Sequence, residues 1–286
     1  MSYFKTNDGV SLYYSVRGEG KPLLMVQGWT FTAKLWEKNA QWLAEKCKVI
    51  CMDHRGHGES EKVMHSHCIA RYAMDVKNLL DELELEDVTV LGSSMGAAVF
   101  WSYLQLFGNH RVSGLICVDQ SPCQYNGPDW RWGQTGCYDV ESFIRTCDQI
   151  LYDPRGAAEK MARGVLCEAP GPEQIKEIAD EICKCPGEVR IKIMRDHTNL
   201  DWRDFLPHIT LPTLVMVARK GTVFPWRGCA WVGEHIPGAE TVFFENSGHM
   251  IYREEPEKFN RVVAEFVCRA ETGEKRREGK KEEREA

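Results

Sequence analysis

Residues 88–98 read VTVLGSSMGAA: an apolar strand leads directly into the pentapeptide GSSMG and then into a helix. A G-x-S-x-G pattern between a strand and a helix predicts a sharp turn that strains the backbone of Ser94 and exposes its hydroxyl above a sheet. The start of the following helix also favours negative charge that develops nearby. A glycine-rich turn with an unreactive serine is the alternative, which the strand-to-helix context disfavours. Ser94 is therefore the candidate nucleophile.

Apolar strands alternate with amphipathic helices on both sides of this motif. The pattern predicts an α/β fold whose mostly parallel, eight-stranded sheet is covered by helices on both faces. An opening hairpin is expected over 3–5 and 12–16, turning at Asn7-Asp8-Gly9. Further strands are expected at 23–27, 48–52, 88–91, 114–118, 213–218 and 240–244, with helices at 36–46, 73–83, 95–107, 226–235 and 256–268.

The alternation stops between residues 120 and 207, where helical patches occur but no clear strand. We interpret 120–207 as a mainly helical cap inserted into a core formed by 1–119 and 208–270. Residues 271–286, ETGEKRREGKKEEREA, contain six cations, six anions and no large apolar residue. They are expected to be a flexible, charged tail.

Composition excludes several classes of partner. A net charge of −6 without a basic stripe in the body of the chain argues against nucleic acid and anionic membranes. The N-terminus lacks the apolar core of a signal peptide, and no run of eighteen apolar residues occurs, so a cytoplasmic protein with a small-molecule substrate is expected. The twelve cysteines are dispersed and are expected to be thiols.

Two short clusters contain residues that can bind metals: Cys183-Lys184-Cys185, and His65 with His67 and Cys68. Neither has a second ligand pair at the spacing of a zinc site, so no metal is expected, and no cofactor is needed for the chemistry considered below.

Residues 53–60, DHRGHGES, are similar to the D-x-R-G-x-G-x-S loop of the α/β-hydrolase family, and GSSMG resembles the nucleophile turn of that family. The resemblance covers about residues 3–268. It implies that this loop is mainly structural, so His54 and His57 are loop residues and not bases.

A serine hydroxyl needs a base to take its proton. His249 is the best candidate of the nine histidines, because it lies in NSGHM (246–250) after the last apolar strand and before the final helix. This segment resembles the family's S-G-H turn and satisfies the chain order serine, acid, histidine. An ordinary surface histidine is the alternative.

The third member of the triad departs from the common family pattern. The family usually carries its acid after the seventh strand, as G-x-x-D, but here Gly221 occupies that place. Asp119 instead follows the strand ICV, at the sheet edge where α/β active sites open. Because a triad is defined by geometry, Asp119 is the candidate acid. An aspartate that caps the entry to the cap is the alternative.

The resemblance also implies two backbone N–H groups that would stabilise an oxyanion, those of Met95 and Trp29. Gln27 replaces the histidine usual in the loop before Trp29. The Gly-Trp and Ser-Met pairs resemble the cofactor-free haloperoxidase and esterase branch. That branch normally has H-G-W-P and the later acid, which are absent here, so the chain is not assigned to it.

These residues predict a serine hydrolase that cleaves a carboxylic ester or lactone through an acyl-enzyme. The cap is rich in aromatic residues, which favours a small hydrophobic or aromatic substrate unless these rings only form the cap's own core. Carbon–carbon bond hydrolysis, cofactor-free oxygenation and a slow-turnover small-molecule receptor remain open. The aromatic residues concerned are Tyr125, Trp130, Trp132, Tyr138, Phe143 and Trp202.

Overall fold

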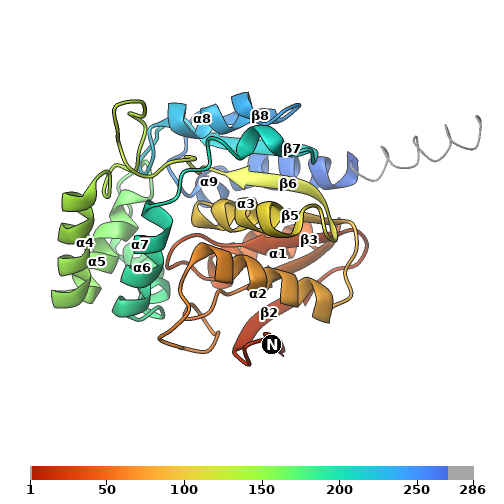
Figure 1. The fold of residues 1–286 in the computed structure, drawn as a ribbon, viewed down its shortest axis with the longest axis horizontal. Helices are drawn as coiled ribbons and strands as arrows, with labels where there is room; N and C mark the ends of the chain where they lie inside the picture. Colours follow the sequence, from red (N-terminus) through yellow and green to blue (C-terminus); the bar gives the residue numbers. More distant parts are fainter. Residues whose placement is uncertain (1, 270–286) are drawn as a thin grey trace, which may run out of the picture.

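The computed structural model of the chain describes residues 2–269 (Figure 1). The charged tail predicted for 271–286 lies outside the described residues. Eight strands form one sheet in the order β1-β2-β4-β3-β5-β6-β7-β8, and only the pairs β1·β2 and β2·β4 are antiparallel. The predicted fold class is therefore confirmed. The strands are β1 (Ser2–Lys5), β2 (Ser11–Arg17), β3 (Pro22–Val26), β4 (Lys48–Met52), β5 (Val88–Ser93), β6 (Val112–Val118), β7 (Thr213–Ala218) and β8 (Glu240–Phe244).

Helices cover both faces of this sheet because successive strand residues point to opposite sides. Leu24 and Val26 of β3 pack in one apolar cluster with α2 (Ile69–Glu82), α3 (Met95–Phe107) and α8 (Trp226–His235). Leu23 and Met25 pack in a second cluster, with α1 (Glu37–Leu43) and a helix over 256–269. A 3₁₀ turn, η1 (Ala33–Trp36), precedes α1, and α9 (Ile251–Glu254) precedes the last helix.

Two helices differ from their predicted bounds. The α2 helix begins at Ile69, four residues before the predicted start, because buried Ile69 and Tyr72 extend its apolar stripe. The N–H of Ile69 also donates to Asp196 Oδ2 at 2.7 Å, a partner distant in sequence. The helix predicted over 36–46 starts as a 3₁₀ turn and its α-helical part ends at Leu43.

The segment between β6 and β7 contains four helices that lie together beside one end of the sheet (Figure 1). It includes 120–207, the range that we propose as the cap, and contributes no strand to the sheet. The helices are α4 (Val140–Tyr152), α5 (Pro154–Gly164), α6 (Pro172–Cys183) and α7 (Gly187–Thr198), followed by the 3₁₀ turn η2 (Leu206–His208).

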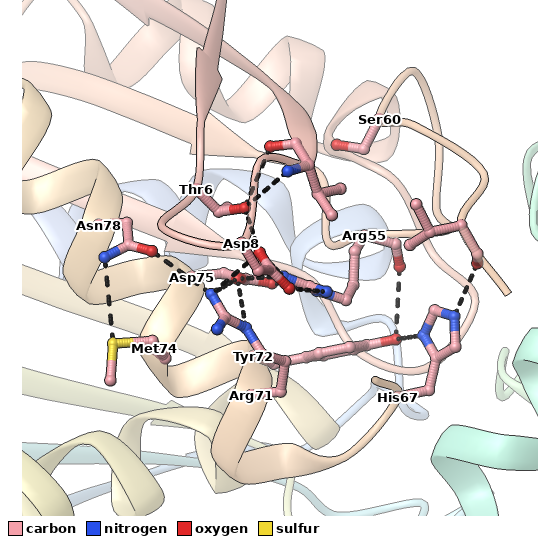
Figure 2. A network of polar contacts seen from close by, with 12 residues as sticks. Thr6, Asp8, Arg55, Ser60, His67, Arg71, Tyr72, Met74, Asp75 and Asn78 are labelled. Atoms are coloured by element: carbon pink, nitrogen blue, oxygen red, sulfur yellow. Dashed lines mark hydrogen bonds and ion pairs between the residues drawn. The ribbon is translucent and has the colours of Figure 1, made fainter. Parts of the chain in front are cut away.

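Arg55 ties the 53–60 loop to the first hairpin and to α2 (Figure 2). Its Nε and Nη2 donate to the two carboxylate oxygens of Asp75 at 2.7 Å each, and Nη1 donates to Asp8 Oδ2 at 2.9 Å. The hydrogen bonds from Arg55 hold the pKa of the Asp8 carboxyl well below its usual range. The guanidinium is fully buried, so both carboxylates offset the cost of removing its charge from water.

The two histidines of this loop are held by backbone oxygens. His54 Nε2 lies 3.1 Å from the carbonyl oxygen of Gln27, and His57 Nδ1 lies 3.0 Å from that of Arg55. Burial lowers the pKa of His54 to about 4 and also lowers that of His57, so both rings are neutral near pH 7. Their contacts agree with the structural role that the family resemblance implies.

Candidate active site

Ser94 lies in the turn between β5 and α3 with φ 53° and ψ −128°, a conformation that residues other than glycine rarely adopt. Its N–H donates to the carbonyl oxygen of Val118 at 2.8 Å. The flanking glycines are needed for close packing: a Cβ on Gly92 would lie 2.3 Å from the backbone of Gly96, and one on Gly96 would lie 2.4 Å from Val26 O. The strained turn predicted from the sequence is therefore present.

The loop after β3 passes directly against Ser94. A Cβ on Gly28 would lie 2.7 Å from Ser94 Cβ and 3.3 Å from Ser94 Oγ. Trp29 follows Gly28, and its indole Nε1 donates to the carbonyl oxygen of Arg190 at 2.9 Å. Met95 is the first residue of α3, so its N–H has no partner within the helix. Trp29 and Met95 both line the cavity that contains Ser94.

Asp119 and His249 meet although 130 positions separate them. The Nδ1–H of His249 donates to Asp119 Oδ2 at 2.7 Å, while Asp119 Oδ1 accepts from the N–H of Ala218 at 3.0 Å. Asp119 is fully buried, with φ 46° immediately after β6. The Nδ1 contact leaves Nε2 of His249 to serve as the proton acceptor. Within residues 2–269, Ser94 Oγ and His249 form no hydrogen bond, and such bonds often shorten only when substrate is bound.

The place where the resemblance expects an acid cannot easily hold one. Gly221 has φ +52°, and a Cβ there would lie 2.7 Å from the carbonyl oxygen of Phe224. The neighbouring Thr222 holds the backbone of His249, because its Oγ1 accepts from the N–H of His249 at 3.1 Å.

Two consecutive carboxylates hold the turn that carries His249. Glu254 Oε2 accepts from the N–H of Gly248 at 2.7 Å, and its Oε1 accepts from the N–H of Cys167 at 2.8 Å. Glu255 Oε2 accepts from the hydroxyl of Ser247 at 2.7 Å. One carboxylate therefore links the His249 turn to the segment that follows α5.

A cavity of about 220 Å³ joins these residues. Ser94 and His249 line it together with the helices between β6 and β7. Its apolar lining comprises Trp29, Phe31, Met95, Cys137, Ile150, Ala157, Ala158, Met161, Val165, Ile182, Met194, Val223 and Phe224.

The six aromatic residues that favoured a hydrophobic or aromatic substrate do not line this cavity, so their contacts agree with the alternative that these rings serve packing. Three of the six are buried among other apolar side chains, whereas Tyr138 is exposed. Trp202 lies 6.0 Å from Trp101 between ring centroids, and Trp130 lies 5.7 Å from Trp231. Phe143 is buried with Cys137 and Met194.

Comparisons with known proteins give the same architecture. A sequence model of the family described as alpha/beta hydrolase fold matches residues 21–135. An esterase from Exiguobacterium antarcticum superposes with a TM-score of 0.89 at 24% identity, over 93% of this chain and 99% of the esterase. The chain has the α/β-hydrolase fold.

Two curated relatives match the chain over nearly its full length. The AB hydrolase superfamily protein YisY of Bacillus subtilis is 27% identical over 92% of this chain and 98% of its own. The pimeloyl-[acyl-carrier protein] methyl ester esterase of Vibrio cholerae is 26% identical over 91% of this chain and 99% of its own.

Among residues 2–269, no three His, Cys, Asp or Glu side chains are grouped so that they could bind a metal ion. No helix in the same range is long and apolar enough to span a membrane.

Sequence reasoning missed Thr222, Glu254 and the Arg190 carbonyl as partners of the site. Glu254 and Glu255 follow His249 by five and six positions, and this closeness in sequence is a weak indication that they contact its turn. Thr222 and Arg190 offered none, because their contacts depend on how loops distant in sequence pack together.

The close contact at Gly28 predicts a selective loss of catalytic activity when a side chain is added there. Gly28→Ala places a methyl group against Ser94 and displaces the Trp29 N–H, and we expect kcat to fall at least about 10²-fold, as for loss of one oxyanion donor. Gly136→Ala is the matched control, because Gly136 also lines the cavity but its Cβ would meet nothing within 4 Å. Steady-state kinetics with a p-nitrophenyl ester measures both variants; equal effects would contradict this placement of the loop.

Proposed function

We propose that the chain is a serine hydrolase that cleaves the carboxylic ester or lactone of a small hydrophobic molecule through an acyl-enzyme. The observation that carries the proposal is the 2.7 Å hydrogen bond between His249 and Asp119, in a cavity that Ser94 also lines. Ester hydrolysis is also the activity named for the relatives from Vibrio cholerae and Exiguobacterium antarcticum.

In the proposed reaction Ser94 Oγ attacks the carbonyl carbon while its proton passes to His249 Nε2. The N–H groups of Trp29 and Met95 stabilise the negative charge on the carbonyl oxygen. His249 then protonates the leaving oxygen as the C–O bond breaks, which gives the acyl-enzyme and an alcohol. Water, deprotonated by His249, then adds to the acyl carbon. The bond between this carbon and Ser94 Oγ breaks, Oγ takes the proton back from His249, and the acid is released. Asp119 stabilises the imidazolium in both steps.

We also propose a reducing, cytoplasmic location. All twelve cysteines are free, and several are buried among apolar side chains. Free thiols in this number suit a compartment in which disulfides do not persist.

The activity is tested with p-nitrophenyl esters of increasing acyl length, from acetate to hexanoate, together with phenylacetate. The apolar part of the cavity lining is mostly aliphatic, so kcat/KM should rise roughly fourfold per methylene until this part is filled, at about 0.8 kcal/mol per buried CH₂. A steady decrease from acetate onward would contradict the hydrophobic substrate class. A single burst without further turnover would identify a receptor in place of an enzyme.

A further inference from the structure

Two arginines of the described chain are buried, and only one has a carboxylate partner. Arg55 is 0% exposed and pairs with Asp8 and Asp75, as Figure 2 shows. Arg190 is 3% exposed, and within residues 2–269 no carboxylate oxygen lies within 4.0 Å of it. A buried charge without a counter-ion is costly, so the lack of a partner for Arg190 needs an explanation.

Neutral backbone groups hold Arg190 in place. Its Nε donates to the carbonyl oxygen of Cys185 at 2.8 Å, and its Nη1 donates to that of Pro154 at 3.3 Å. These bonds use two of the five N–H groups of a guanidinium and supply no negative charge. The side chain is thus oriented by the fold, with donors left for a further acceptor.

Arg190 lines the same cavity as Ser94 and His249. Met194 and His197 follow it by four and seven positions on α7 and also line the cavity, as expected for one face of a helix. Among the described residues the lining contains no Asp or Glu, while Lys160 adds a second cation on α5. A cavity with cations and no anion attracts negatively charged ligands.

We propose that Arg190 binds a carboxylate of the substrate. The substrate is then an ester or lactone whose apolar part ends in a carboxylate distant from the carbonyl that Ser94 attacks. The planar guanidinium suits a carboxylate because it donates parallel hydrogen bonds, and Arg190 is itself buried, so water screens the ion pair little. This proposal rests on the proposed function and specifies its substrate.

The test compares mono-p-nitrophenyl esters of dicarboxylic acids, from succinate to pimelate, with esters of monocarboxylic acids of equal chain length. The wild type should prefer the charged ester at one chain length by at least about tenfold in kcat/KM. R190Q should lower kcat/KM for that ester at least about 30-fold more than for its neutral counterpart, the effect of truncating one partner of a buried charge pair. R190K, which keeps the charge, should retain part of the preference. R195Q removes an exposed cation from the same helix and should keep the preference entirely.

Equal losses for both esters in R190Q would show that Arg190 only supports the fold and would overturn the proposal. If R190Q does not fold, inhibition of the wild type decides instead. Free dicarboxylates should then inhibit more strongly than monocarboxylates of equal length, and equal inhibition would overturn the proposal. Hydrolysis of neutral esters without any preference for charge would leave the proposed function standing and reject only this inference. Absence of hydrolysis with every ester would reject the proposed function itself.

Discussion

Asp119→Asn is expected to lower kcat by about 10⁴-fold with little change in KM, as the equivalent change does in a serine protease. The hydrogen bond from the Ala218 N–H fixes the oxygen of the new amide, so its NH₂ group must face His249 Nδ1. A donor at that position favours the tautomer with its proton on Nε2, which cannot accept the proton of Ser94. Steady-state kinetics and a thermal unfolding curve together separate this effect from loss of folding.

Glu234→Gln is the control for Asp119, because Glu234 is the first carboxylate after β7 and is exposed. This variant should have nearly the kcat of the wild type. Adding Gly221→Asp to Asp119→Asn should not restore activity, because Gly221 has a positive φ and no room for a Cβ. Near-full activity of Asp119→Asn beside an inactive Glu234→Gln would disprove the proposed acid.

Ser94→Ala should lower kcat by about 10⁶-fold, the effect of removing the serine of a working triad. The loss follows because no other hydroxyl occupies the strained turn above the sheet. A fluorophosphonate probe should label the wild type at Ser94 and leave the alanine variant unlabelled, as mass spectrometry of the tryptic peptides would show.

Ser93→Ala is the matched control for this experiment. Ser93 precedes Ser94 in the same pentapeptide but is buried as the last residue of β5. It should keep both labelling and turnover. Labelling at Ser93, or unchanged turnover in Ser94→Ala, would mean that the nucleophile is another residue.

The sequence predicted those elements best in which local pattern and tertiary burial agree. The bounds of β4, α3, β7, α8 and β8 match the predictions, because each is a short apolar run or amphipathic stretch between clear turn signals. Where a distant partner decides the boundary, as for Ile69 of α2 with Asp196, the local pattern was insufficient.

The candidate site was partly predictable for a geometric reason. Parallel strands end at the same edge, and the pairing of Ser93 with Val118 places the residues after β5 and β6 side by side. Ser94 and Asp119 are therefore neighbours by register alone. The lining of the cavity was not predictable, because composition alone does not say whether a ring of the cap faces inward or packs on Trp101.

Because the proposed acid, Asp119, follows β6, the loop after β7 lines the pocket without also carrying the acid of the triad. Val223 and Phe224, in the loop after β7, line the cavity, yet this loop carries no member of the proposed triad. The loop contacts His249 in two ways: the Thr222 hydroxyl accepts from its N–H, and the Phe224 ring packs edge-on against its imidazole at 5.7 Å between ring centroids. A mutant library at 223 can thus reshape the pocket for new substrates while the Asp119–His249 pair stays intact, whereas a change at 224 would also alter the packing against His249.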